Sequence, residues 1–118
     1  MSNKAHIKLL LGAVAMALVW GFSAHVYAAA IDAEGAEALA KKNGCFKCHA
    51  IDKTKKGPSY KKIAAKYKGK EAEGVTKMTK NMTESPTVKL EDGSEEEHKK
   101  IEATPEQIKN LISWIQSL

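Results

Sequence analysis

The sequence predicts an all-α fold of about four helices. Apolar residues recur at helical spacing in four segments, helix-capping residues mark the ends of these segments, and no strand-rich segment competes with them. The chain has 118 residues and no internal repeat, which is enough for a single domain. We therefore expect one small helical domain.

The first residues have the pattern of a secretory signal. After a basic start, residues 9–22 form an unbroken apolar and glycine run, shorter than the roughly 20 residues that cross a bilayer core. A small-x-small cleavage pattern ends at Ala28, with a second option at Ala30. We expect residues 1–28 to be a cleaved signal peptide and residues 29–118 to be the domain. The alternative is an uncleaved anchor.

Two helices are predicted in the first half of this domain. The first begins near the N-cap Asp32 and ends at Asn43-Gly44, and the second follows the turn Gly57-Pro58 and ends at Gly69. The apolar residues that share a face are Ala33, Ala36, Leu39 and Ala40 in the first helix and Tyr60, Ile63, Ala64 and Tyr67 in the second.

A third helix is predicted from Glu71 to Met82, with Val75, Met78 and Met82 on one face, and Ser85-Pro86 ends it. The next segment, residues 87–100, is polar and poorly patterned. A turn signal inside it hints at a hairpin, but the second arm has no apolar face, so we expect a loop.

The last helix has the clearest pattern. Thr104-Pro105-Glu106-Gln107 combines an N-cap, a proline at the first helical position and a glutamine that completes a capping box. The apolar residues that follow at helical spacing are Ile108, Leu111, Ile112 and Ile115, with Trp114 beside them.

All basic residues are lysines, and charge is unevenly distributed along the chain. Residues 41–70 contain eleven lysines and one acid, whereas residues 84–106 contain eight acids and three lysines. The folded molecule is thus expected to be an electrical dipole whose field orients charged partners. Export and the lack of arginine argue against nucleic acid as a partner. The alternative is a solvated lysine surface without a partner.

The motif Cys45-Phe46-Lys47-Cys48-His49 carries the chemistry. It is the C-x-x-C-H signature of covalent haem attachment, in which two thiols add to the haem vinyl groups and the adjacent histidine ligates the iron. A thioredoxin-like centre lacks its βαβ setting, a zinc site lacks a second ligand pair, and a disulfide does not explain His49. We expect one haem c, attached through Cys45 and Cys48, with His49 as the proximal iron ligand.

Residues 34–70 resemble the bacterial class I cytochromes c of the short, single-haem, periplasmic type, and residues 104–118 resemble the last helix of that family. The resemblance implies a periplasmic monomer in which the first and last helices cross beside the haem. It also implies that the carbonyl of Pro58 accepts a hydrogen bond from the second nitrogen of the motif histidine. The side chains expected to pack around the haem are Pro58, Tyr60, Ile63, Tyr67, Met78 and Trp114.

The sequence departs from this family in the distal iron ligand. Most members place a methionine a few residues before the last helix, but this chain has Glu97-His98-Lys99-Lys100 there. Once the signal is removed, His49 and His98 are the only histidines, so we predict bis-histidine ligation and a relatively low reduction potential. The alternatives are Met82 as ligand, a five-coordinate iron, or a merely exposed His98 in a charged loop.

These features predict an electron carrier rather than an enzyme, because two strong axial ligands leave no position for a substrate. Lysines at the attachment edge (Lys47, Lys53, Lys55 and Lys56) are expected to dock transiently on acidic redox partners. No stable membrane span is expected after signal cleavage. The alternative function is a haem-based ligand-binding or sensing protein in which His98 detaches from the iron.

Overall fold

The computed structural model describes residues 29–118, and the predicted signal peptide lies outside this part of the chain. Its helices are α1 (Ala33–Lys42), α2 (Tyr60–Tyr67), α3 (Glu71–Glu84) and α4 (Pro105–Gln116), and a 3₁₀ turn, η1 (Cys45–Lys47), follows α1. Strands β1 (Thr87–Lys89) and β2 (Glu95–Glu97) form a small ribbon between α3 and α4. The four predicted helices and the all-α class are confirmed. Within residues 29–118, no helix is long and apolar enough to span a membrane.

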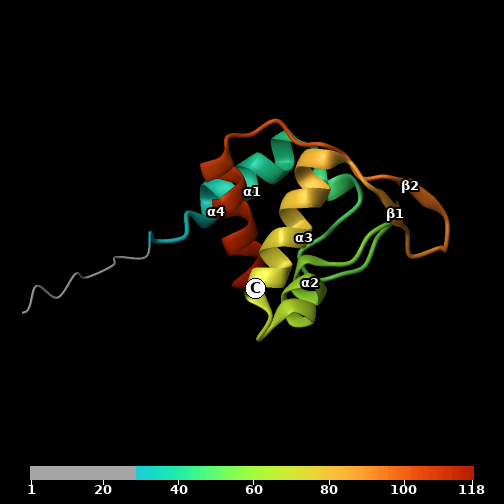
Figure 1. Cartoon of the computed structure of the whole chain (residues 1–118), viewed down its shortest axis with the longest axis horizontal. Coiled ribbons are helices and arrows are strands. Elements are labelled where there is room, and N and C mark those ends of the chain that lie inside the picture. The colour runs from blue at the N-terminus through green and yellow to red at the C-terminus, as the bar shows by residue number, and fades with distance from the viewer. Residues whose placement is uncertain (1–28) are drawn as a thin grey trace, which may run out of the picture.

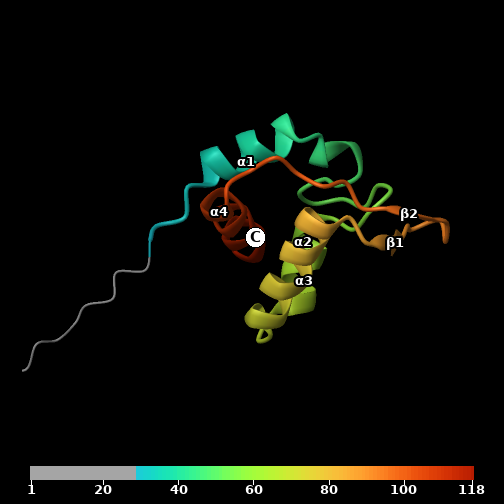
Figure 2. The same ribbon diagram turned by 45° about the horizontal axis from the view of Figure 1, so that its top comes forward.

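Helix α4 lies at the centre of the packing, because α1, α2 and α3 all contact it. The side chains of Leu111, Ile112 and Ile115 are at most 1% exposed. The N–H of Gln107 donates to the Thr104 hydroxyl at 3.2 Å, and the Gln107 side chain accepts the Thr104 N–H at 2.9 Å, so the predicted capping box is present. Figures 1 and 2 show α1 crossing α4, as the resemblance implied.

The first turn of α1 is tied to α4. The Asp32 carboxylate caps α1 by accepting the N–H of Gly35 at 2.8 Å. Asn110 of α4 also exchanges two hydrogen bonds with the backbone of Asp32, accepting its N–H at 2.9 Å and donating to its carbonyl at 2.8 Å. After α1, Gly44 adopts a φ of +69°, a left-handed conformation that favours glycine. The chain therefore turns away from α1 directly before Cys45.

The buried stripe of α3 differs from the predicted one at its N-terminal end. Met78 and Met82 are buried, but Val75 is 42% exposed, so the prediction that it shares their face is wrong. Gly74 takes its place, because a Cβ there would lie only 2.8 Å from Cγ of Tyr67 in α2. The absence of a side chain lets α3 approach α2 closely, and sequence periodicity does not register a glycine as a packing residue.

Residues 87–97 form a β-hairpin, and the prediction of a loop is wrong. Strand β1 pairs antiparallel with β2, with Val88 opposite Glu96, and the connecting turn contains Gly93 at a φ of +88°. Both strands are largely exposed. The backbone ladder and the turn stabilise the hairpin without the apolar face whose absence led to the loop prediction. Figure 1 shows the hairpin projecting beyond the helices.

Candidate haem-binding site

The attachment motif forms one tight turn. The N–H groups of Cys48 and His49 both donate to the carbonyl of Cys45, at 3.2 Å and 2.9 Å. In a 3₁₀ turn, residues three apart lie on the same side, so the two free, partly buried thiols face one direction. Burial raises the pKa of the Cys45 thiol. The two sulfurs are arranged to reach one edge of a porphyrin.

The His49 imidazole is held by the loop that follows it. Its Nδ1 donates to the carbonyl of Pro58 at 2.7 Å, which is the hydrogen bond expected from the resemblance. Gly57 lies against the ring, because a Cβ there would be 2.8 Å from Cε1 of His49. Burial lowers the pKa of His49 and favours the neutral imidazole. With Nδ1 occupied, Nε2 is the nitrogen that remains to bind a metal.

Aromatic side chains pack around the His49 ring. Tyr60 stacks on it with ring centroids 5.4 Å apart, and Trp114 meets Tyr60 edge-on at 5.7 Å. Phe46, inside the motif, is tilted against Tyr60 at 5.8 Å. The other predicted packing residues, Pro58, Ile63, Tyr67 and Met78, are buried or half-buried. The site therefore has the apolar surroundings that a large flat cofactor requires.

His98 lies close to His49 in space, although half of the described chain separates them. The two ring centroids are 6.2 Å apart and the ring planes are inclined by 40°. The N–H of His98 donates to the carbonyl of Pro86 at 2.9 Å, and its Nδ1 lies 3.0 Å from the carbonyl of Lys99. The structure thus brings together the two histidines that the sequence named as axial ligands.

Met82 and Met78 have the burial of core residues. They are 8% and 5% exposed, and both belong to the hydrophobic core formed with α4. The carbonyl of Met82 accepts the N–H of Ile101 at 2.9 Å, which links α3 to the segment that follows β2. Met82 remains the alternative to His98 as distal ligand.

Asn43 is a residue whose role the sequence did not reveal, because the pattern marks it only as the end of α1. Its side chain is 7% exposed and hydrogen-bonds to the backbone of Glu102, 59 positions away. No local pattern points to a partner at that separation. Phe46, Ile51 and Ala103 also pack against the core, and of these the aromatic residue inside the motif was the readable signal.

Comparison with known proteins gives this site a family. Residues 33–118 match the model of the cytochrome c family, a range that holds all four helices, both cysteines and both candidate histidines. The chain belongs to the cytochrome c family. As such a protein, with Cys45 and Cys48 in one turn, it fits one covalently bound haem c with its iron. The facing thiols, the Nε2 that His49 presents and the aromatic surroundings agree with this cofactor.

Similar proteins include cytochromes c-551 and a class 1 cytochrome of known structure. Cytochrome c-551 of Pseudomonas aeruginosa is 54% identical over 37 residues, which is 31% of this chain and only 36% of that relative's length. Cytochrome c-551 of Pseudomonas denitrificans is 32% identical over 87 residues, covering 70% of this chain and 95% of the relative. The crystal structure of the class 1 cytochrome MtoD from Sideroxydans lithotrophicus ES-1 is 52% identical and superposes with a TM-score of 0.70, covering 75% of this chain and 97% of that one.

Proposed function

We propose that this cytochrome c is an exported electron carrier of the periplasm in which His49 and His98 both ligate the haem iron. The observation that carries the proposal is the 6.2 Å between the two imidazole centroids. Two metal–nitrogen bonds of about 2 Å and two ring radii of about 1.1 Å together span about 6.3 Å. The spacing of the rings is therefore that of two ligands on opposite sides of one metal ion.

The hydrogen bonds of the two rings support the same ligand pair. A metal-bound histidine usually donates its second N–H to a carboxylate or a backbone carbonyl. The Nδ1 of His49 has the Pro58 carbonyl as partner, and the Nδ1 of His98 has that of Lys99. Both rings then present Nε2 for coordination, which a solvated surface histidine has no need to do.

This ligand pair decides what the protein can do. When bound, the haem supplies a one-electron couple, and two strong axial ligands leave no coordination position for a substrate. A second imidazole stabilises ferric iron more than a thioether does, so the proposed potential is lower than that of methionine-ligated relatives. Transfer of single electrons, without bond chemistry on a substrate, is the activity that fits.

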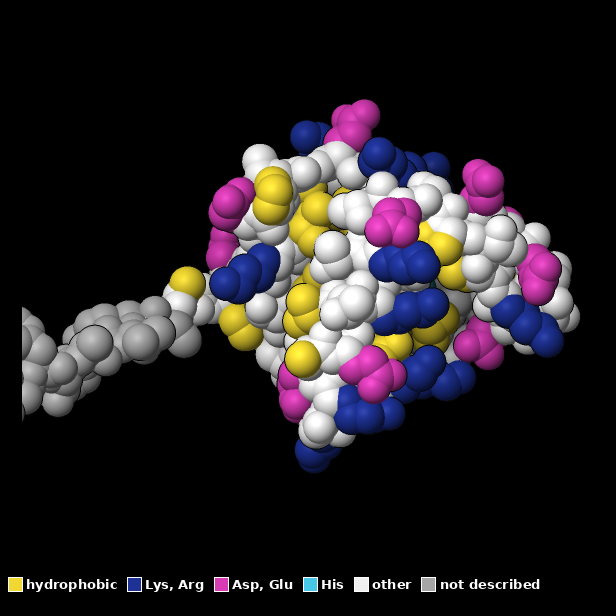
Figure 3. Space-filling model, viewed as in Figure 1, with side chains coloured by type: hydrophobic (Ala, Val, Ile, Leu, Met, Phe, Trp, Pro, Cys, Tyr) yellow, Lys and Arg dark blue, Asp and Glu magenta, His cyan; other side chains and the backbone are white. Residues whose placement is uncertain are grey.

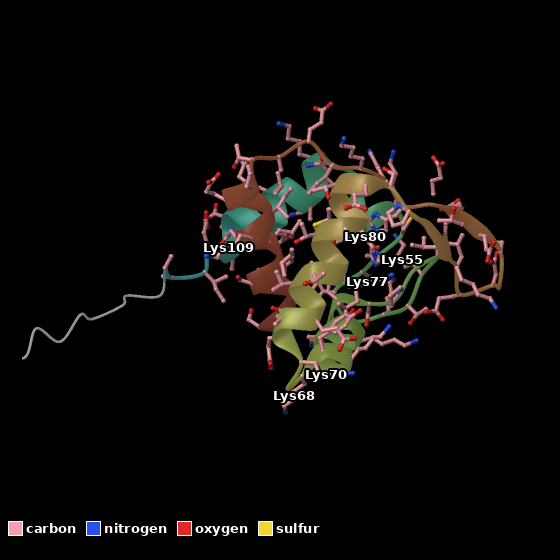
Figure 4. The ribbon with its side chains drawn as sticks, in the orientation of Figure 1. Lys55, Lys68, Lys70, Lys77, Lys80 and Lys109 are labelled. Atoms are coloured by element: carbon pink, nitrogen blue, oxygen red, sulfur yellow. The ribbon has the colours of Figure 1, made fainter. Side chains whose placement is uncertain are left out.

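The proposed docking surface for redox partners is the lysine-rich edge beside the attachment turn. Lys53 and Lys55 line an open hollow together with His49, and the Lys55 ammonium donates to the carbonyl of Phe46 within the motif. Figure 3 shows further lysines gathered over the α3 side, where Figure 4 labels Lys77 and Lys80. Such a surface suits a transient, salt-sensitive encounter with an acidic protein.

Optical and spin-resonance spectra of the holoprotein test the axial ligands. The ferric protein is expected to be low-spin without a far-red methionine–iron charge-transfer band. His98→Ala should convert it to a high-spin spectrum, whereas Met82→Leu should leave the spectrum unchanged. A methionine band in the unaltered protein, abolished by Met82→Leu, would remove His98 from the coordination sphere.

A haem-based sensor is the second candidate, because residues 98–104 have no helix or strand and His98 is half-buried. In that case His98 would leave ferrous iron and open a position for a gas. Mixing the ferrous protein with carbon monoxide separates the two functions. Rapid binding favours the sensor, whereas an electron carrier with a retained ligand binds carbon monoxide slowly or not at all.

A further inference from the structure

The segment that carries His98 has few contacts to fix its position. Residues 98–104 form neither helix nor strand, and three hydrogen bonds of about equal length hold their backbone N–H groups. Two of these bonds run to backbone carbonyls, from His98 to Pro86 and from Ile101 to Met82. In the third, the N–H of Glu102 donates to the Asn43 side chain at 2.9 Å. Only this third bond depends on the identity of a side chain.

Asn43 bonds to the segment in both directions. Its Oδ1 accepts the N–H of Glu102, and its Nδ2 donates to the Glu102 carbonyl at 3.4 Å and to the Leu39 carbonyl at 3.1 Å. The side chain is only 7% exposed, so water cannot readily replace these partners. An asparagine amide supplies one acceptor and two donors, which matches the three bonds found here.

A second contact lies next to the first. A Cβ at Gly44 would be 3.3 Å from Nζ of Lys99, so the residue after His98 extends over the residue before Cys45. The segment therefore meets the attachment turn at two successive positions, Asn43 and Gly44. One end of this contact lies two residues from the first haem thiol, and the other lies four residues from His98.

We infer that Asn43 is a positioning residue that holds the His98 segment against the haem-attachment turn and thereby keeps the distal histidine in place. The inference rests on the proposed ligation by His98. It assigns to a residue at the end of α1 an influence on the opposite face of the haem. The function of this contact is to oppose departure of His98 from the iron, beyond its contribution to folding.

Asn110 provides a matched control for the test. Like Asn43, it exchanges two hydrogen bonds with one backbone residue, Asp32, but it joins α4 to the start of α1 and does not touch the His98 segment. The measurement is the rate at which cyanide binds the ferric holoprotein, which is limited by departure of the distal ligand. Asn43→Ala should raise this rate about tenfold, the effect of losing about one to two hydrogen bonds. Asn110→Ala should leave it within about twofold while lowering thermal stability comparably.

A conservative variant keeps the test decisive if Asn43→Ala is too unstable to mature. Asn43→Asp retains the acceptor for the Glu102 N–H and loses both donors, so its cyanide rate should lie between those of the unaltered protein and Asn43→Ala. Equal rates for the Asn43 and Asn110 variants would overturn the positioning role. A methionine band in the unaltered ferric spectrum would instead overturn ligation by His98, and the inference with it, so the two failures are distinguishable.

Discussion

Gly57 fits so closely against His49 that no larger residue has room there. A Cβ on Gly57 would lie 2.8 Å from Cε1 of the imidazole and 3.3 Å from the carbonyl of Cys48. Gly57→Ala should therefore displace the ring and cost about 1–3 kcal/mol of stability. Thermal unfolding of the holoprotein, followed at the haem absorption band, measures the cost and should also show an altered ferric spectrum.

Gly69 provides the control for this prediction. It has a φ of +77° and a Cβ there would have no atom within 4 Å, so Gly69→Ala adds backbone strain of about 1–2 kcal/mol away from the site. Its melting temperature should fall, while its haem spectrum stays that of the unaltered protein. Equal spectra for both variants would show that Gly57 does not act through His49.

His98→Met tests the link between the distal ligand and the potential. A thioether favours ferrous iron, so the reduction potential should rise by a sizeable part of the roughly 0.8 V range that axial ligands span. Voltammetry measures the shift, and the far-red band reports whether the new sulfur binds. A methionine band with an unchanged potential would contradict the proposed origin of the low potential.

Prediction at the residue scale succeeded where partners are near in sequence. Cys45, Cys48 and His49 form a short motif, and Pro58 lies nine residues from the histidine that it bonds. Asn43 could not be predicted in the same way, because its function depends on a backbone contact with Glu102 that only the folded chain creates.

At the scale of elements, the contact between α2 and α3 depends on Gly74. A Cβ there would meet Tyr67 at 2.8 Å and the Gln116 side chain at 2.6 Å. Gly74→Val should separate the helices and destabilise the protein by about 1–3 kcal/mol, despite the better helix propensity of valine. Thr76→Val, at an exposed position of the same helix, should change stability by less than about 0.5 kcal/mol in chemical denaturation. Similar losses in both variants would contradict the packing role of Gly74.

The helices were predictable because their end signals are local. Asp32, Ser59 and Thr104 each accept a backbone N–H three residues further along the chain, and the sequence alone identified the first and last of these. The hairpin was missed because its strands have no buried face, so the usual alternation is absent. Backbone pairing and the Gly93 turn were sufficient, and neither leaves a hydrophobic pattern.

At the scale of the whole molecule, charge is separated between the attachment edge and the hairpin. Only two ion pairs occur within residues 29–118, Lys41–Glu37 and Lys62–Glu91, so most lysines remain available to a partner. The uneven charge distribution was readable from the sequence. Which lysines share a surface was not, because that depends on how the loop of residues 50–58 folds beside His49.

Charge neutralisation at the attachment edge should slow reaction with an acidic partner. Lys53→Gln combined with Lys56→Gln is expected to lower the second-order rate of electron transfer to an anionic redox protein several-fold at low salt. The difference should vanish as ionic strength rises, because the screening length shrinks to about 3 Å at 1 M salt. Lys109→Gln is the control, since Figure 4 places that side chain apart on α4. An equal loss from Lys109→Gln would indicate an effect of net charge alone.

The projecting hairpin also makes this cytochrome easy to immobilise. No atom lies within 4 Å of a Cβ built on Gly93, and both strands beside it are largely solvent-exposed. Lengthening such a turn costs little, since loop-closure entropy grows only slowly with length. An affinity peptide grafted between Gly93 and Ser94 would tether the molecule to an electrode by a peripheral arm while the helical core keeps its packing.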